Sequence, residues 1–297
     1  MTRRFRRRLN QGRKALLLGL LAASLLSVPS LAQVRTPQAS GTTVFSNGSA
    51  VIDASNASQG YVMVKYSGGT SRIKVRISKG TEYTYDLNTA GNYEVFPLTE
   101  GSGTYTIKVF QQVQGTSYAQ VMSQTVTANI ADSQSPFLYP NQFCNFNANS
   151  AVVAKAAELT GGISDPLAKV QAVYRYVIDH ISYDYQKAAS VQSGYLPVPD
   201  AALASGKGIC FDYAAVMTSM LRSQDIPTKL VIGYTGGTYH AWVSVYLTGQ
   251  GWVDNIIYFD GTNWRYMDPT FASSGKGDAA VSNYISNQAN YQAKFTY

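Results

Sequence analysis

The spacing of the apolar residues changes once along this chain, between Ile130 and Ser150, and that change divides the expected fold. Before it, apolar and polar residues alternate in short runs. In the run 72–77, RIKVRI, the isoleucines and valine would face a core while the basic side chains face water, as in a half-buried strand. Turn clusters separate such runs at the spacing of an all-β sandwich. Residues 41–130 are therefore predicted to form an immunoglobulin-like sandwich.

The second part of the chain mixes helical and strand patterns, after a connector predicted at 131–149. Ser150 is a plausible N-cap for one helix that stops at Gly161. Asp165 can cap a second helix, with Pro166 at its first position and apolar residues at helical spacing up to Ile181. Three strand-like runs follow, at 228–234, 241–247 and 263–270. An α+β domain is therefore expected over 150–297.

The first 32 residues have the pattern of a signal peptide rather than of a folded segment. A basic stretch precedes a short apolar run, and Ser30-Leu31-Ala32 is a small-residue cleavage site. No later segment is apolar enough to cross a bilayer. The sequence predicts a protein that is secreted or otherwise extracytoplasmic.

The net charge of +7 belongs to this leader. Seven of the 24 Lys and Arg residues, and none of the 17 acids, lie in residues 1–32, so the remainder is neutral. The basic balance therefore gives no argument for a nucleic-acid partner. We also expect no cofactor and no bound metal.

The stretch GKGICFDYAAVMTSM (206–220) contains the feature with the most chemical content. Cys210 lies between a glycine-rich approach and a helix, at the helix N-terminus, where unpaired N–H groups and the helix dipole favour a thiolate. The same N–H groups could stabilise an oxyanion. Cys210 could instead be a packed thiol, or pair with Cys144, the second cysteine, in an oxidising compartment.

A thiol nucleophile needs a base and a group that orients the base. His180 ends the helix that follows Asp165, and the C-terminal helix dipole accounts for a histidine there. His240 begins a strand after a Gly-Gly loop and is the better base. Asp268, at the end of a strand expected to return beside the His240 strand, is the preferred orienting group. Asp254 and Asp260 are weaker choices.

Together these segments resemble the transglutaminase-like family of thiol enzymes. The resemblance rests on GKGICFDYA, IPTKLVIGY, HAWVSVY and WRYMDPTF, with the upstream helix DPLAKVQAVYRYVIDHISYD, and covers about residues 150–275. It implies a papain-like α+β core in which Cys210 is the nucleophile, His240 the general base and Asp268 the group that orients His240. Phe211-Asp212 departs from the polar residue and glycine common in the family at those positions.

The resemblance implies acyl transfer through a Cys210 thioester, with water or an amine as acceptor. Hydrolysis of a peptide or amide bond is favoured, with a protein or peptide substrate that includes cell-surface or cell-wall material. Two alternatives remain: protein-glutamine cross-linking, and a non-catalytic surface-binding protein in which Cys144 and Cys210 are bridged. Gln142, Tyr183 and Trp242 are candidates for a second oxyanion donor.

Overall fold

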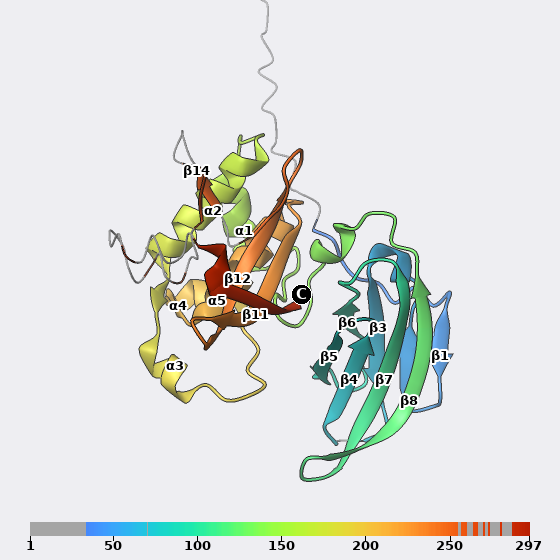
Figure 1. The fold of residues 1–297 in the computed structure, drawn as a ribbon. Coiled ribbons are helices and arrows are strands. Elements are labelled where there is room, and N and C mark those ends of the chain that lie inside the picture. The colour runs from blue at the N-terminus through green and yellow to red at the C-terminus, as the bar shows by residue number, and fades with distance from the viewer. Residues whose placement is uncertain are drawn as a thin grey trace, which may run out of the picture.

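The computed structural model describes residues 34–297 except 70, 255–256, 260–263, 267–269, 271–272, 274–279 and 281–286. The chain forms two lobes, an N-terminal lobe of strands and a C-terminal lobe of helices and strands (Figure 1). The predicted signal peptide lies outside the described residues. Among the described residues, no helix has the length and apolar character needed to cross a membrane.

The N-terminal lobe, called the sandwich below, contains two four-stranded antiparallel sheets. The first has the order β1 (Val44–Ser46), β2 (Ala50–Asp53), β3 (Tyr61–Tyr66), β6 (Glu94–Pro97). The second has the order β5 (Glu82–Leu87), β4 (Ile73–Ser78), β7 (Gly103–Gln114), β8 (Ser117–Ala128). Two short 3-10 helices, η1 (Ala57–Gln59) and η2 (Ser135–Phe137), precede β3 and follow β8.

The alternation that predicted these strands is confirmed in β4. Ile73, Val75 and Ile77 are buried, while the residues between them are half-buried. The basic side chains of this strand meet acidic partners on β5: Lys74 Nζ lies 3.1 Å from Asp86 Oδ1. The basic face is thus a paired, solvated strand face.

Five helices of the C-terminal lobe, called the α+β lobe below, lie within the described residues. They are α1 (Ala151–Thr160), α2 (Pro166–His180), α3 (Tyr185–Ser190), α4 (Pro199–Ser205) and α5 (Cys210–Arg222). Both predicted N-caps stand at the right positions, and the Asp165 carboxylate accepts from Ala168 N–H at 3.0 Å. Ser150 does not cap α1 with its side chain. Instead Asp200 of α4 accepts from Val152 N–H at 2.9 Å.

The main sheet of this lobe is antiparallel, in the order β13 (Gly251–Val253), β12 (Thr238–Leu247), β11 (Thr228–Thr235), β16 (Tyr291–Thr296). Helix α5 packs on β11 and β12 and is itself surrounded by α1, α2 and α4. The described residues also form two pairs of short strands: β9 (Ser182–Tyr183) with β10 (Lys207–Gly208), and β14 (Ile257–Phe259) with β15 (Trp264–Tyr266). A 3-10 turn, η3 (Gln288–Asn290), precedes β16.

One expectation about this sheet is wrong. The strand before Asp268 was expected beside the His240 strand, yet β15 pairs with β14 in a separate hairpin. The neighbours of β12 are β11 and β13. The short turn between β12 and β13 lets the chain pair immediately with the end of β12, at Val245–Leu247, and β15 pairs instead with the adjacent β14.

A continuous hydrophobic cluster joins the two lobes. It contains sandwich residues such as Ile107 together with Ala214 of α5 and Leu230 of β11. The end of β16 lies between the lobes, where the chain terminus is marked in Figure 1. Aromatic rings fill the junction, with Tyr297 4.2 Å from Phe143 and 5.8 Å from Tyr85 between centroids. The sandwich therefore packs directly against the α+β lobe and is not joined to it by the connector alone.

Candidate active site

Cys210 is the first residue of α5, as the sequence predicted. The preceding residue, Ile209, is extended, and its N–H donates to the Asp212 carboxylate at 2.8 Å. Glycine is needed at position 208 because a Cβ there would lie 2.6 Å from Asp212 Cβ. Glycine at position 208 therefore allows the chain to pass close to the first turn of α5.

The first turn of α5 leaves donors available beside the thiol. The N–H groups of Asp212 and Tyr213 donate to Ile209 O at 2.9 and 3.1 Å. No described residue accepts from the N–H of Cys210 or of Phe211. The thiol itself is free and half-buried. These N–H groups and the helix dipole can stabilise negative charge at this position.

His240 is the third residue of β12 and is buried, opposite Gly233 of β11. Its ring centroid lies 6.2 Å from that of Trp242 and 6.5 Å from that of Tyr291. Because α5 packs on β12, Cys210 and His240 stand on elements in direct contact.

Two tyrosines lie near the thiol. Tyr183 of β9 is in register with Gly208, two residues before Cys210. Tyr239 precedes His240. Burial, and to a smaller extent the charge of Cys210, raises the pKa of both phenols above 10.0. The surroundings of the thiol are thus largely aromatic.

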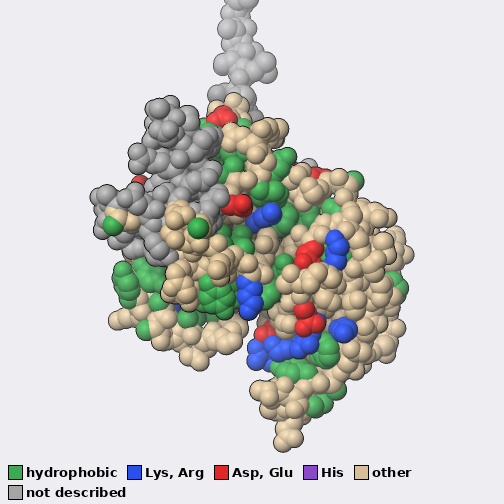
Figure 2. Space-filling model, viewed as in Figure 1, with side chains coloured by type: hydrophobic (Ala, Val, Ile, Leu, Met, Phe, Trp, Pro, Cys, Tyr) green, Lys and Arg blue, Asp and Glu red, His purple; other side chains and the backbone are tan. Residues whose placement is uncertain are grey.

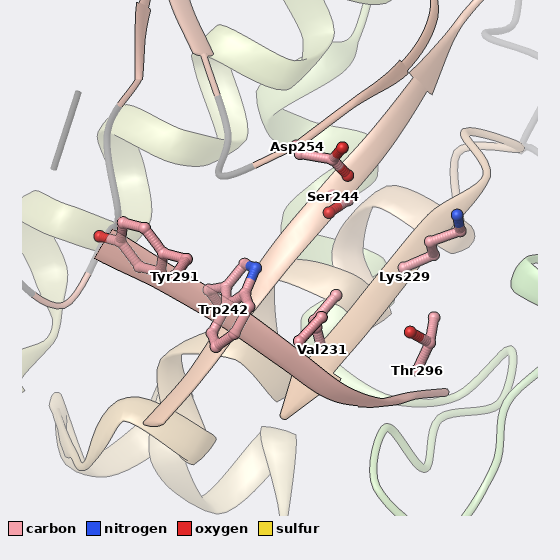
Figure 3. A pocket seen from close by; sticks show the side chains of 8 residues that line it. Lys229, Val231, Trp242, Ser244, Asp254, Tyr291 and Thr296 are labelled. Carbon is pink, nitrogen blue, oxygen red and sulfur yellow. The ribbon is translucent and has the colours of Figure 1, made fainter. Parts of the chain in front are cut away.

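A cavity of 340 Å³ opens on the main sheet, on the side of Trp242 (Figure 3). Its lining includes Trp242, Ser244, Tyr291 and Lys229. Asp254, one of the weaker candidates for the orienting acid, projects into this cavity from the end of β13. Burial lowers the pKa of Lys229, against the opposing effect of Asp254. Two of its lining residues, Trp242 and Tyr291, are also the rings that lie near His240.

The predicted triad is described only in part. Asp268 lies outside the described residues, and so does Asp260. His180 ends α2 at the surface, with its ring stacked 4.8 Å from Tyr176 and Nε2 3.3 Å from Leu203 O. The helix-end role expected for His180 agrees with these contacts.

Cys144 is also a free thiol, and it is fully buried. Its Sγ lies 3.2 Å from Nη1 of Arg222, which is buried at the end of α5. Burial raises the pKa of the Cys144 thiol and lowers that of the Arg222 guanidinium. The structure therefore contains no Cys144–Cys210 bridge.

Gln142, a candidate oxyanion donor, is engaged elsewhere. Its amide donates to Asp86 O at 3.1 Å and to Glu94 Oε1 at 3.0 Å, both in the sandwich. The side chain of Gln142 is therefore hydrogen-bonded to the sandwich. Trp242 lines the sheet cavity, and Tyr183 lies near the thiol.

Sequence reasoning missed a buried polar group beside the nucleophile. The Asp212 carboxylate, 1% exposed, accepts from Lys187 Nζ at 2.7 Å and from the Tyr195 hydroxyl. An acid at the third position of a helix predicted to begin at Cys210 was the available signal, because acids stabilise helix N-termini. The partners, 17 and 25 residues upstream, gave no such signal. No cluster of metal-ligating side chains occurs within the described part of the chain.

Comparisons with known proteins agree on the α+β lobe. Residues 153–269 match the family model of the transglutaminase-like superfamily. The uncharacterized protein YebA of Bacillus subtilis is 25% identical over 237 residues, which are 73% of this chain and 29% of that protein. A protein-glutamine gamma-glutamyltransferase of Pseudomonas aeruginosa is 30% identical over 122 residues, 36% of this chain and 18% of that protein.

Among solved structures, the periplasmic domain of TgpA from Pseudomonas aeruginosa is similar, with a TM-score of 0.38 and 16% identity. The match covers 84% of this chain and 81% of that domain. The two curated relatives are much longer proteins, of which this chain spans less than a third.

Proposed function

We propose that this chain, whose residues 153–269 match the transglutaminase-like superfamily, is a thiol-dependent acyl-transfer enzyme. The favoured reaction is hydrolysis of a peptide or amide bond. Cys210 is the proposed nucleophile, His240 the general base and Asp268 the group that orients His240. The superfamily match includes all three positions.

The observation that carries the proposal is the free thiol at the first residue of α5. A helix N-terminus stabilises a thiolate, and a thiolate is the reactive form of cysteine. The N–H groups of Cys210 and Phe211, which no described residue accepts from, are the proposed donors to the oxyanion. A cysteine kept only for packing would need neither feature.

The proposed reaction has two steps. The Cys210 thiolate attacks the carbonyl carbon, the carbon–nitrogen bond breaks, and the His240 imidazolium gives its proton to the departing amine. Water then attacks the thioester, His240 accepts a proton from that water, and the carboxylic acid product leaves. Of the remaining candidates for a second oxyanion donor, we favour Tyr183, because it lies near Cys210 while Trp242 lines the sheet cavity.

Cross-linking of proteins is the second candidate function. The likeness to a protein-glutamine gamma-glutamyltransferase over 122 residues favours it. In that reaction a lysine amine takes the place of water as acceptor, with the same thioester intermediate. A bridged, non-catalytic protein is less well supported, because both cysteines are free thiols.

We further propose that the chain acts outside the cytoplasm, on protein or peptide material such as that of the cell surface or wall. The support is the basic, then apolar, then small-residue pattern of residues 1–32.

The test combines alkylation with a substrate screen. Iodoacetamide should label Cys210 in the native protein, while the buried Cys144 should react only in denaturant. The screen measures peptide and amide hydrolysis beside incorporation of an amine, with Cys210→Ala as the blank. His240→Ala should lower turnover by about 10²-fold or more. His180→Ala, at the surface end of α2, is the matched control and should retain activity.

If Cys210→Ala turned over substrate as fast as the unchanged protein in every assay, the proposal that this chain is a Cys210-dependent enzyme would be refuted. Amine incorporation exceeding hydrolysis would instead assign the cross-linking reaction.

A further inference from the structure

Asp212 lies two residues after Cys210 and is the buried carboxylate nearest to it along α5. Three donors surround it: Ile209 N–H at 2.8 Å, Lys187 Nζ at 2.7 Å and the Tyr195 hydroxyl. Lys187 Nζ also donates to the Tyr195 hydroxyl at 2.6 Å. The three side chains form a closed network against the first turn of the helix.

Both partners come from one excursion of the chain, residues 184–198, which leaves after β9 and returns at α4. Lys187 lies in α3, and its ammonium also lies 4.4 Å above the Tyr195 ring. The Tyr195 ring is 6.3 Å from that of Phe211, the residue after the nucleophile. The excursion is therefore attached to α5 at the position of the thiol.

The sandwich supports this excursion from its outer side. Gly194 has φ +87°, and a Cβ there would lie 3.4 Å from Arg72 Nη2 and 3.7 Å from Asp86 Oδ2. Arg72 Nε donates to Asp86 Oδ1 at 2.9 Å, so the loop meets an ion pair between Arg72, which directly precedes β4, and Asp86 of β5. In Figure 2, basic and acidic side chains gather along the boundary of the two lobes.

The charge of Asp212 has two opposing effects. A carboxylate at a helix N-terminus stabilises the helix. The same negative charge, within one turn of Cys210, disfavours a second anion there. The Lys187 ammonium compensates that charge. Partial burial opposes the charged form of Lys187, yet its hydrogen bonds to Asp212 and Tyr195 raise its pKa. Burial and Asp212 also raise the pKa of Tyr195 to about 12, so its hydroxyl remains a donor.

We propose that Lys187 is a positioning residue for the acyl-transfer reaction: paired with Asp212 and held by Tyr195, it cancels a buried negative charge beside Cys210 and so keeps the thiol reactive near neutral pH. This inference rests on the proposed role of Cys210 as nucleophile. Among the described residues, the other titratable groups that interact with Cys210 from packed elements are Tyr183 of β9 and Tyr239 of β12, with His240 next to Tyr239. Both phenols are neutral near pH 7.

The test measures the rate of Cys210 alkylation by iodoacetamide as a function of pH, in the full chain. Lys187→Met leaves the Asp212 charge uncompensated, so the alkylation midpoint should rise and the rate at pH 7 should fall about tenfold. Asp212→Asn leaves Lys187 unopposed, so the midpoint should fall. Lys187→Arg retains the charge and should retain the midpoint. Lys207→Met, which removes an exposed cation three residues before the thiol, is the matched control and should change the rate less than twofold.

If charge causes the effect, Lys187→Met and Asp212→Asn shift the pH midpoint of Cys210 alkylation in opposite directions. A purely structural network would instead give shifts of the same sign, or slower alkylation with an unchanged midpoint, and either result would overturn the inference. If Lys187→Met does not fold, the Asp212→Asn and Lys187→Arg midpoints still decide it. Absence of turnover in the unchanged protein would refute the proposed function, whereas wrong midpoints in an active enzyme would refute this inference alone.

Discussion

Arg222 gives the sharpest prediction about what holds the two lobes together. Its guanidinium is buried at the end of α5 and donates to Thr228 O at 2.8 Å and to Tyr297 O at 2.7 Å. It also donates to Tyr139 O and to Cys144 Sγ in the connector. One side chain thus binds the connector, the start of β11 and the end of the chain beside β16.

Replacing Arg222 by Met removes these donors and leaves the carbonyl oxygens of Thr228 and Tyr139 without them, while Tyr297 O still accepts from Leu230 N–H at 2.9 Å. An unsatisfied buried acceptor costs about 1–3 kcal/mol. The variant no longer has to bury a cation, and this gain offsets part of the cost of the unsatisfied acceptors. We therefore expect the free energy of unfolding to fall by about 3–5 kcal/mol, as when one partner of a buried charged network is removed. That is a large share of a typical unfolding free energy of about 5–15 kcal/mol.

The assay is urea unfolding followed by fluorescence, together with the rate at which native Cys144 reacts with a thiol reagent. Cys144 loses its covering partner in Arg222→Met and should become reactive at low urea. Arg35→Met is the control, since Arg35 pairs with Asp225 at the surface at 3.0 Å and should cost at most about 1 kcal/mol. An Arg222→Met protein that unfolds within 1 kcal/mol of the unchanged chain, about the scale of a surface pair, would refute the reasoning.

Two further outcomes follow from the packing and the charges. Gly233→Ala should destabilise the main sheet by about 1–3 kcal/mol or more, because its Cβ would lie 2.0 Å from Gln292 O; Gly161→Ala, with nothing nearer than 3.4 Å, should not. Burial raises the pKa of Asp86, but its hydrogen bonds to basic neighbours, Arg72 foremost, outweigh this and lower it below 3.8. The stability due to ionised Asp86 is therefore present above pH 3.8 and lost as the pH falls further. Asp86→Asn should lose less stability than the unchanged chain between pH 6 and pH 3, measured by urea unfolding; an equal loss would contradict the assignment.

The features predicted correctly from sequence are local ones. Helix α2 begins at Pro166, directly after its cap Asp165, because a capping residue followed by proline specifies a helix start. The alternation in β4 and the start of α5 at Cys210 were likewise contained in short segments. Strand β16 and its pairing with β11 were not predicted, because pairing between distant segments leaves no periodic signal in either.

In the candidate site, too, local features were predicted from the sequence and contacts between distant segments were not. Cys210 and His240 were identified by their places at a helix start and a strand start, and the structure puts them there. The network on Asp212 depends on a chain excursion that returns Lys187 and Tyr195 to the helix. Asp212, Lys187 and Tyr195 come together only in the folded chain. In the sequence alone, Phe211-Asp212 is visible only as a departure from the family pattern.

The pairing of β11 with β16 also fixes an order of events during synthesis. The ring of Phe295 on β16 lies 5.5 Å from that of Tyr83 in the sandwich, so residues from both ends of the chain meet in the same aromatic junction. A nascent chain that has made α5 and β12 still lacks the outer strand of this sheet. The thiol and the histidine are thus translated long before the sheet that holds the histidine is complete. Until β16 is made, Cys210 and His240 lie on elements of an incomplete sheet, so this part of the lobe is fully assembled only when β16 pairs with β11.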